Sequence, residues 1–263
     1  MDWTRISNAA AGMAAGGDVG AAIQRASAST GVEFNYLFNQ AKLESGLDPT
    51  VRANTSSATG LFQFIDQTWL GTVSKHGAEH ALGWAANAIR QGQDGRYYVS
   101  DPATRQAILD LRKNPEAAST MAAELASDNR AVLEQTLGRK AEPVDLYLAH
   151  FLGAGGAATF LRAHDTNPDA PAAALLPQAA RANRAIFFDK NGTPRTVAEI
   201  RDRFAAKLDG SAAPAPVRIP AGGEFIPLRL STLQYGTAPV GAGPRPSPQY
   251  ARLAYLMLAD LGG

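Results

Sequence analysis

The sequence predicts a mainly α-helical protein, and three observations carry this prediction. Alanine is abundant and apolar residues recur with helical spacing over roughly the first 164 residues. Segments with the alternation of a β-strand are scarce. Eight of the chain's 16 prolines fall between residues 209 and 248. We therefore expect one helical domain over 1–208, an extended proline- and glycine-rich linker over 209–248, and an amphipathic helix over 249–263.

Turn and capping residues divide the expected domain into helices. Gly31, Gly46 and Gly138 are placed to end helices, and Thr196 with Glu199 forms a capping box that starts one. The helices are expected at 19–29, 34–45, from Asp66 through Val73, from Pro102 through Leu111, 115–137, 143–164 and 197–208. The segment 143–164 is expected to form two short helices around a glycine-rich turn at 153–156.

Composition narrows the possible partners and cofactors. Twenty-five basic and 24 acidic residues give a net charge of +1, so no strong overall field attracts nucleic acid or an anionic membrane. There is no cysteine, which excludes disulfides, thiolate metal sites and cysteine nucleophiles. No apolar run approaches the roughly 18 residues of a membrane-spanning helix, and the first residues lack the features of a signal peptide. We expect a monomer without membrane insertion.

The sequence gives no indication of a cofactor or metal site. The four histidines do not form an HExxH spacing. His76 and His80 are four residues apart, but Gly77 weakens a helix between them, which favours a solvated surface pair over a pair of metal ligands.

Glu44 is the first charged residue along the chain that falls on the apolar face of a predicted helix. The helix over 34–45 has an apolar stripe, and Glu44 lies three residues after Ala41 and seven after Leu37, on that stripe; the stripe consists of Phe34, Leu37, Phe38 and Ala41. Removing a carboxylate from water favours its protonated form. The alternatives are a surface glutamate at a frayed helix end and a glutamate paired with a cation such as Arg52.

A second unusual segment, SSATGLFQFIDQTW, follows at 56–69. Gly60 allows the chain to pass close to a neighbour. Gln63 stands between Phe62 and Phe64, and an amide among aromatic rings is typical of polar recognition in an apolar cleft. A sugar presents apolar C–H faces and a rim of hydroxyls, which such a cleft would suit. Alternation on a half-buried segment is the simpler explanation.

These two segments resemble the soluble lytic transglycosylase (SLT-type) domain family of bacteria and their phages, which is related to goose-type lysozyme. The resemblance rests on Glu44-Ser45-Gly46, on the stretch from Ser57 to Gln63, and on Thr68-Trp69. It covers about residues 19–69 clearly and weakens towards residue 164. It implies a lysozyme-like helical domain.

The resemblance also implies a reaction, the cleavage of the β-1,4 bond between N-acetylmuramic acid and N-acetylglucosamine in peptidoglycan. Glu44 would be the catalytic acid and then the base that closes a 1,6-anhydro ring, with the substrate acetamido group assisting in place of a second carboxylate. Gln63 would bind the N-acetyl group or Glu44. Ser45, Ser57 and Phe62 would contact substrate; for Ser45 helix capping remains open, and for Phe62 a place in the core is favoured.

The third element of the family departs from the pattern. Where the family has an A-Y-N-A-G-type stretch, this chain has AHFLGAGG. Phe151 stands at the tyrosine position and Leu152 at the asparagine position. The family tyrosine helps to orient the acid, so here its role is absent or passes to Tyr147, one helical turn earlier.

Two further functions stay open at this stage. One is a hydrolytic muramidase, for which Asp48 and Asp66 are the nearby second carboxylates, although a turn and a helix N-cap already explain them. The other is an inactive peptidoglycan-binding or scaffold module, which would dock to an envelope machine through the helix over 249–263. A flap that returns to its own domain is the alternative role for that helix. In each case the expected location is the periplasm or cell envelope, reached by a route that the N-terminal residues do not encode.

Overall fold

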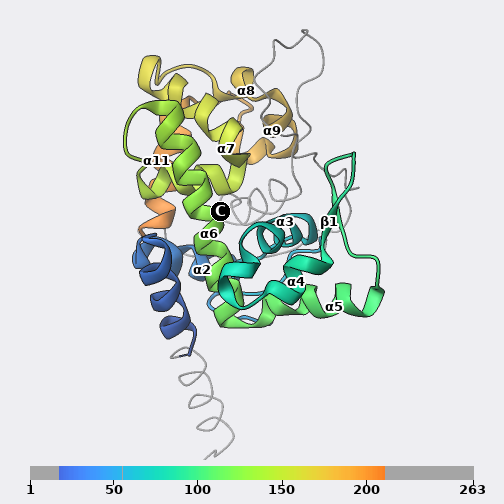
Figure 1. Cartoon of the computed structure of the whole chain (residues 1–263). Coiled ribbons are helices and arrows are strands. Elements are labelled where there is room, and N and C mark those ends of the chain that lie inside the picture. The colour runs from blue at the N-terminus through green and yellow to red at the C-terminus, as the bar shows by residue number, and fades with distance from the viewer. Residues whose placement is uncertain (1–17, 55, 211–263) are drawn as a thin grey trace, which may run out of the picture. The chain divides into compact units, whose positions relative to one another are not determined.

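The computed structural model describes residues 18–54 and 56–210, and this part of the chain is mainly helical (Figure 1). The α-helices lie at 18–30, α2 Phe34–Ser45, α3 Asp66–His76, α4 Gly83–Ala88, α5 Pro102–Asp110, α6 Pro115–Leu137, α7 Pro143–Thr166, α8 Ala172–Leu175, α9 Pro177–Ala182, α10 Arg184–Phe187 and α11 Val197–Leu208. Short 3-10 helices lie at η1 Gly77–His80 and η2 Leu111–Lys113. One two-stranded sheet pairs β1 Arg90–Gln91 with β2 Tyr97–Tyr98. The prediction of a mainly helical protein is confirmed.

The chain divides into two compact units. Among the described residues, the first unit comprises 18–90 and 97–127, and the second comprises 91–96 and 128–210. The expectation of a single domain over 1–208 stays a prediction. The expected terminal helix over 249–263 and all but the first two residues of the expected linker lie outside the described residues.

The core of the first unit is built around α3. This helix packs against η1, α4 and α5. Trp69 on α3 is fully buried, and its indole Nε1 donates a hydrogen bond to the carbonyl oxygen of Ile108 on α5, at 2.7 Å. Phe64 meets the Trp69 ring edge-on, with ring centroids 5.1 Å apart. Trp69 therefore belongs to the core, as its spacing predicts.

Helix α2 has the bounds that the sequence predicts. Gly46 ends it in the left-handed conformation with φ 63°, and its N–H bonds back to the last turn. The buried face differs slightly from the predicted stripe, because Phe34 and Phe38 are only half-buried and stack on each other. The buried residues of the helix are Tyr36, Leu37, Gln40, Ala41 and Glu44.

The start of α3 corrects one expectation. Asp66 is the first residue of the helix and not its N-cap, and the residue at the N-cap position, Ile65, makes no side-chain capping bond. Instead, the hydroxyl of Ser57 accepts a hydrogen bond from the Asp66 N–H at 3.2 Å. The carboxylate of Asp66 is thereby left for ion pairs with two arginines, which are described below.

In the second unit, α7 packs against α11. The rings of Tyr147 and Phe151 on α7 contact Phe204 on α11, with centroids 5.6 and 5.1 Å away. The capping box of Thr196 and Glu199 is present and starts α11, as predicted. The glycine-rich turn is reduced to a single kink at Gly153, with φ 73° and ψ 155°, and helical structure resumes directly after it.

Helix α7 is long and apolar enough to cross a membrane by length and composition alone. However, 67% of its most apolar window is buried within the fold. Its first turn also carries Asp145, which is fully buried and forms ion pairs with Arg139 at 2.6 Å and Arg201 at 3.3 Å. These features describe the core helix of the second unit.

Candidate active site

Glu44 is buried in the last turn of α2, with 4% of its surface exposed. The alternative of a solvated surface glutamate is therefore wrong. Arg52, which was the candidate cation partner, is exposed, and its side chain lines a polar cavity described below. Gly46 turns the chain sharply two residues after Glu44, so the carboxyl group lies at the C-terminal end of a helix.

Ser45 joins the helix of Glu44 to the loop that carries Gln63. Its hydroxyl donates to the carbonyl oxygen of Leu61 at 2.9 Å and also to that of Ala41 at 3.1 Å. Among the described residues these two carbonyls are its hydrogen-bond partners, and the bond to Ala41 lies within the last turn of the helix, while a contact of Ser45 with substrate stays a prediction. The contact with Leu61 places the two motifs of the predicted site side by side.

Gln63 has an unusual backbone conformation and a buried side chain. Its φ is 49°, in the left-handed region that residues other than glycine rarely adopt. The amide nitrogen Nε2 donates to the carbonyl oxygens of Gly60 and of Val51, the latter at 3.0 Å. Within the described residues, the amide oxygen Oε1 is buried and has no hydrogen-bond partner. The site therefore contains a buried acceptor that a ligand N–H or O–H could satisfy.

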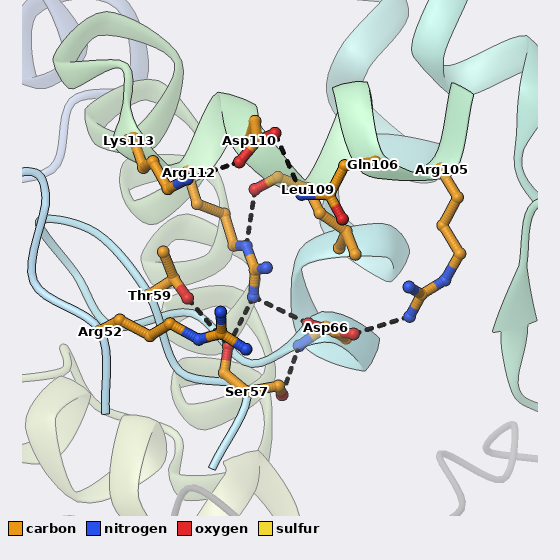
Figure 2. A pocket seen from close by; sticks show the side chains of 10 residues that line it. All are labelled: Arg52, Ser57, Thr59, Asp66, Arg105, Gln106, Leu109, Asp110, Arg112 and Lys113. Carbon is orange, nitrogen blue, oxygen red and sulfur yellow. Dashed lines mark hydrogen bonds and ion pairs between the residues drawn. The ribbon is translucent and has the colours of Figure 1, made fainter. Parts of the chain in front are cut away.

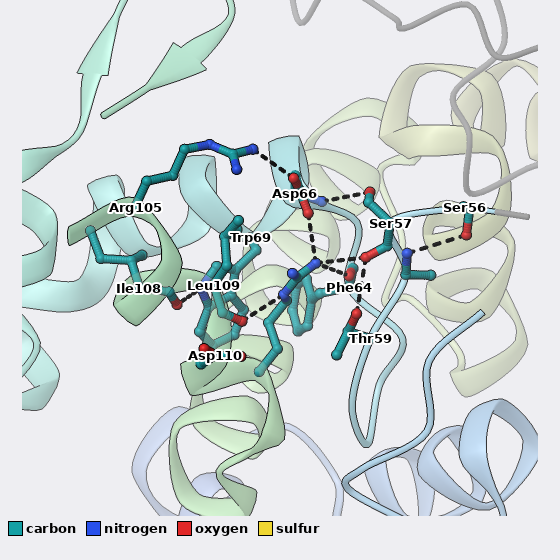
Figure 3. A network of polar contacts seen from close by, with 12 residues as sticks. Ser56, Ser57, Thr59, Phe64, Asp66, Trp69, Arg105, Ile108, Leu109 and Asp110 are labelled. Atoms are coloured by element: carbon teal, nitrogen blue, oxygen red, sulfur yellow. Dashed lines mark hydrogen bonds and ion pairs between the residues drawn. The ribbon is translucent and has the colours of Figure 1, made fainter. Parts of the chain in front are cut away.

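The segment 57–66 is held in place by Arg112, which the sequence did not single out and which is labelled in Figure 2. Figure 3 labels its partners Ser57, Phe64, Asp66 and Leu109. This guanidinium is buried, and Nη1 donates to the carbonyl oxygens of Ser57 at 2.7 Å and Phe64 at 2.9 Å. The same Nη1 lies 2.9 Å from a carboxylate oxygen of Asp66, and Nε donates to the Leu109 carbonyl at 2.8 Å. Burial lowers the pKa of Arg112, and the charge of Asp66 opposes that shift.

Gly60 lies against the backbone of Arg112. A Cβ at this position would come within 1.9 Å of the Arg112 carbonyl oxygen, and φ at Gly60 is 82°. The predicted close approach to a neighbour is confirmed, and both conditions require glycine.

A polar cavity of about 160 Å³ lies behind the same segment (Figure 2). Asp66 lines it between two arginines, with one carboxylate oxygen 2.7 Å from Arg105 and the other 2.9 Å from Arg112. The lining residues are Arg52, Ser57, Thr59, Asp66, Arg105, Gln106, Leu109, Asp110, Arg112 and Lys113. Asp66 pairs with Arg105 and Arg112, and Asp110 pairs with Lys113 at 2.6 Å, so we interpret the cavity as structural support.

Two other predicted contact residues have structural roles in this segment. The hydroxyl of Ser57 accepts from the first N–H of α3, as described above. Phe62 is 1% exposed and packs in the core, which is the role that its spacing favours. Their contacts with a substrate stay predictions.

Tyr36 is a neighbour of Glu44 that the sequence analysis did not predict as part of the site. It is buried on the same helix. Burial raises the pKa of the Tyr36 phenol, and the negative charge of Glu44 raises it further. The spacing of Tyr36, Leu37, Gln40, Ala41 and Glu44 along one helical face was a signal that could have identified this tyrosine.

Tyr147 and Phe151, from the third motif, belong to the second unit, and both are buried. Their side chains contribute to the packing of α7 on α11. Their expected role near Glu44 stays a prediction.

His76 and His80 do not form the solvated pair that was expected. The His76 residue is buried, and both imidazoles approach the same carboxylate, that of Glu124 on α6. The prediction failed because η1 continues the chain beyond α3 in a tight turn and brings His80 back to this carboxylate.

The chain was also compared with models of known protein families, and none of them matches it.

Proposed function

We propose that this chain is a peptidoglycan lytic transglycosylase with a lysozyme-like fold in its helical part. The observation that carries the proposal is the hydrogen bond from Ser45 to the Leu61 carbonyl. It supports a single site in which the buried carboxyl of Glu44 and the buried amide of Gln63 belong to adjacent elements. The motif resemblance of both segments supports the same assignment.

In this proposal Glu44 acts twice. Its carboxyl group first donates a proton to the glycosidic oxygen as the bond to C1 of the muramic acid residue breaks. The substrate acetamido group stabilises the positive charge that develops at C1. The Glu44 carboxylate then accepts the proton of the C6 hydroxyl, whose oxygen attacks C1 and closes the 1,6-anhydro ring.

Gln63 supplies an acceptor in this scheme. Both contacts of Nε2 are with carbonyl oxygens, and the buried Oε1 has no donor among the described residues. The N–H of a substrate acetamido group is such a donor. Binding there would hold the acetamido group that the reaction uses.

The hydrolytic alternative needs a second carboxylate to activate water. Asp48 accepts hydrogen bonds from the N–H and hydroxyl of Thr50, at 2.8 and 2.7 Å, and Asp66 pairs with two arginines. Both are engaged in the structure, which favours the mechanism with one carboxylate. Cell-envelope location and docking through residues 249–263 remain parts of the proposal.

The test compares wild-type protein with Glu44→Gln on purified peptidoglycan, with mass spectrometry of the products. We expect anhydro-muropeptides from the wild type and at least about a hundredfold slower release from the variant. Glu33→Gln is the matched control, because Glu33 is exposed at the start of the same helix and makes no capping bond.

Each other outcome rejects a defined part of the proposal. Reducing ends in place of anhydro ends would identify a hydrolase. Binding without cleavage by the wild type would identify an inactive module. Full activity of Glu44→Gln would remove Glu44 from the mechanism.

A further inference from the structure

The first unit contains a second cluster of ionisable side chains that the proposed reaction does not use. His76 ends α3, Glu79 lies in η1 and Glu124 lies on α6. One ligand-type atom from each of these three side chains lies within 4.8 Å of the others. His80 adds a second imidazole, with Nε2 2.7 Å from Glu124 Oε1.

We propose that His76, Glu79 and Glu124 bind a divalent transition-metal ion of the zinc class. An imidazole nitrogen with two carboxylates is a donor set that suits zinc, whereas calcium and magnesium take oxygen ligands. The inference is independent of the proposed function, since Glu44 takes no part in it.

The distance between His76 and Glu124 fits this assignment. Ligand atoms around a tetrahedral ion with bonds of about 2.05 Å lie ~3.4 Å apart. His76 Nδ1 lies 3.4 Å from Glu124 Oε2, which is longer than an ordinary N–H···O hydrogen bond and equals that spacing. Glu79 is exposed, so its side chain can close on the ion from the solvent side with little loss of packing.

His80 has the position of an outer partner. Its hydrogen bond goes to Oε1 of Glu124, and the oxygen facing His76 is Oε2. A hydrogen bond to the second oxygen fixes the orientation of a ligating carboxylate. Three protein ligands leave a fourth position for water. The ion would connect His76 and Glu79 to Glu124 on α6, which follows them by 48 and 45 residues.

The test is a zinc titration of the full chain after removal of metal with EDTA, followed by calorimetry and by the melting temperature. We expect one zinc ion per chain, a higher melting temperature with zinc, and a visible absorption band when cobalt replaces zinc. Glu79→Gln should weaken zinc binding at least tenfold, and His80→Gln should weaken it about tenfold with the same stoichiometry.

Two controls keep the outcome clear. Glu79 is exposed, so its variant should fold as the wild type does, which EDTA-treated samples would verify by circular dichroism. His164→Gln and Glu44→Gln, which lie outside the cluster, should bind zinc as the wild type does. Absence of saturable zinc binding, or equal affinity in Glu79→Gln and wild type, would overturn the proposal.

Discussion

Gly60 gives the clearest single-residue test of the loop that carries Gln63. Substituting alanine would place a methyl group 1.9 Å from the Arg112 carbonyl oxygen, at a backbone φ of 82°. We expect Gly60→Ala to lower the free energy of unfolding by about 2 kcal/mol or more. Urea denaturation would measure this change.

The control for this substitution is Gly20→Ala. Gly20 lies in the helix over 18–30, and a Cβ there meets no atom within 4 Å. Alanine should therefore be neutral or stabilise the protein by up to about 1 kcal/mol. Equal effects of the two substitutions would mean that Arg112 does not constrain the loop.

We expect the buried Tyr36 to make the free energy of unfolding depend on pH in the alkaline range. Burial and the charge of Glu44 raise the pKa of its phenol above the ordinary value of about 10. The unfolded chain therefore loses this proton at a lower pH than the folded chain does. Above about pH 10 the unfolded state binds fewer protons, so the free energy of unfolding falls as pH rises.

Removal of the Tyr36 hydroxyl should remove this contribution. We expect Tyr36→Phe to lose less stability than the wild type between about pH 8 and pH 11, measured by urea unfolding at both values. Tyr98→Phe is the control, because half of Tyr98 is exposed. An identical loss in the wild type and both variants would contradict the expectation.

The sequence predicted single residues well where the cause was local. Glu44 was assigned to a buried face from helical spacing, and Gly60 to a close approach from its residue type. Arg112 was not identified, because its partners at Ser57 and Phe64 are about 50 residues away and are main-chain oxygens, which leave no pattern in the sequence.

At the scale of the helix, α7 offers a matched pair of glycines. Gly153 has φ 73° and ψ 155°, a conformation that is essentially restricted to glycine, whereas Gly155 is helical and a Cβ there meets nothing within 4 Å. We expect Gly153→Ala to cost about 1–3 kcal/mol and Gly155→Ala to be neutral or stabilising. Thermal unfolding of both variants would show whether the kink is a fixed feature.

Among the features of the secondary structure, the boundaries of the helices were the most predictable from the sequence. Helix α2 ends at Ser45 and α6 begins at Pro115, as Gly46 and the proline indicate. The capping of α3 was predicted wrongly, because Asp66 was assigned to the nearest helix start while its carboxylate serves Arg105 and Arg112. Capping rules consider only residues that are close in the sequence, so they do not account for distant residues that bind the same side chain.

At the scale of the whole molecule, composition and periodicity were enough for the mainly helical class. They did not indicate the division into two units. Residues 91–96, at the tip of the small hairpin, group with 128–210, while the chain on both sides groups with the first unit. Such an arrangement depends on contacts between distant parts of the chain, to which helical spacing is insensitive.

The loop from Ser57 to Phe64 is anchored mainly through its carbonyl oxygens. Three side chains donate to these oxygens. Ser45 donates to Leu61, Arg112 donates to Ser57 and Phe64, and the Gln63 amide donates to Gly60. Every amino acid offers the same carbonyl, so these hydrogen bonds place no requirement on the side chains at the acceptor positions, and burial in the core is what constrains Leu61, Phe62 and Phe64. A distant relative with the same loop should therefore keep the donors and Gly60, and should need only apolar character, rather than identity, at the buried positions between them.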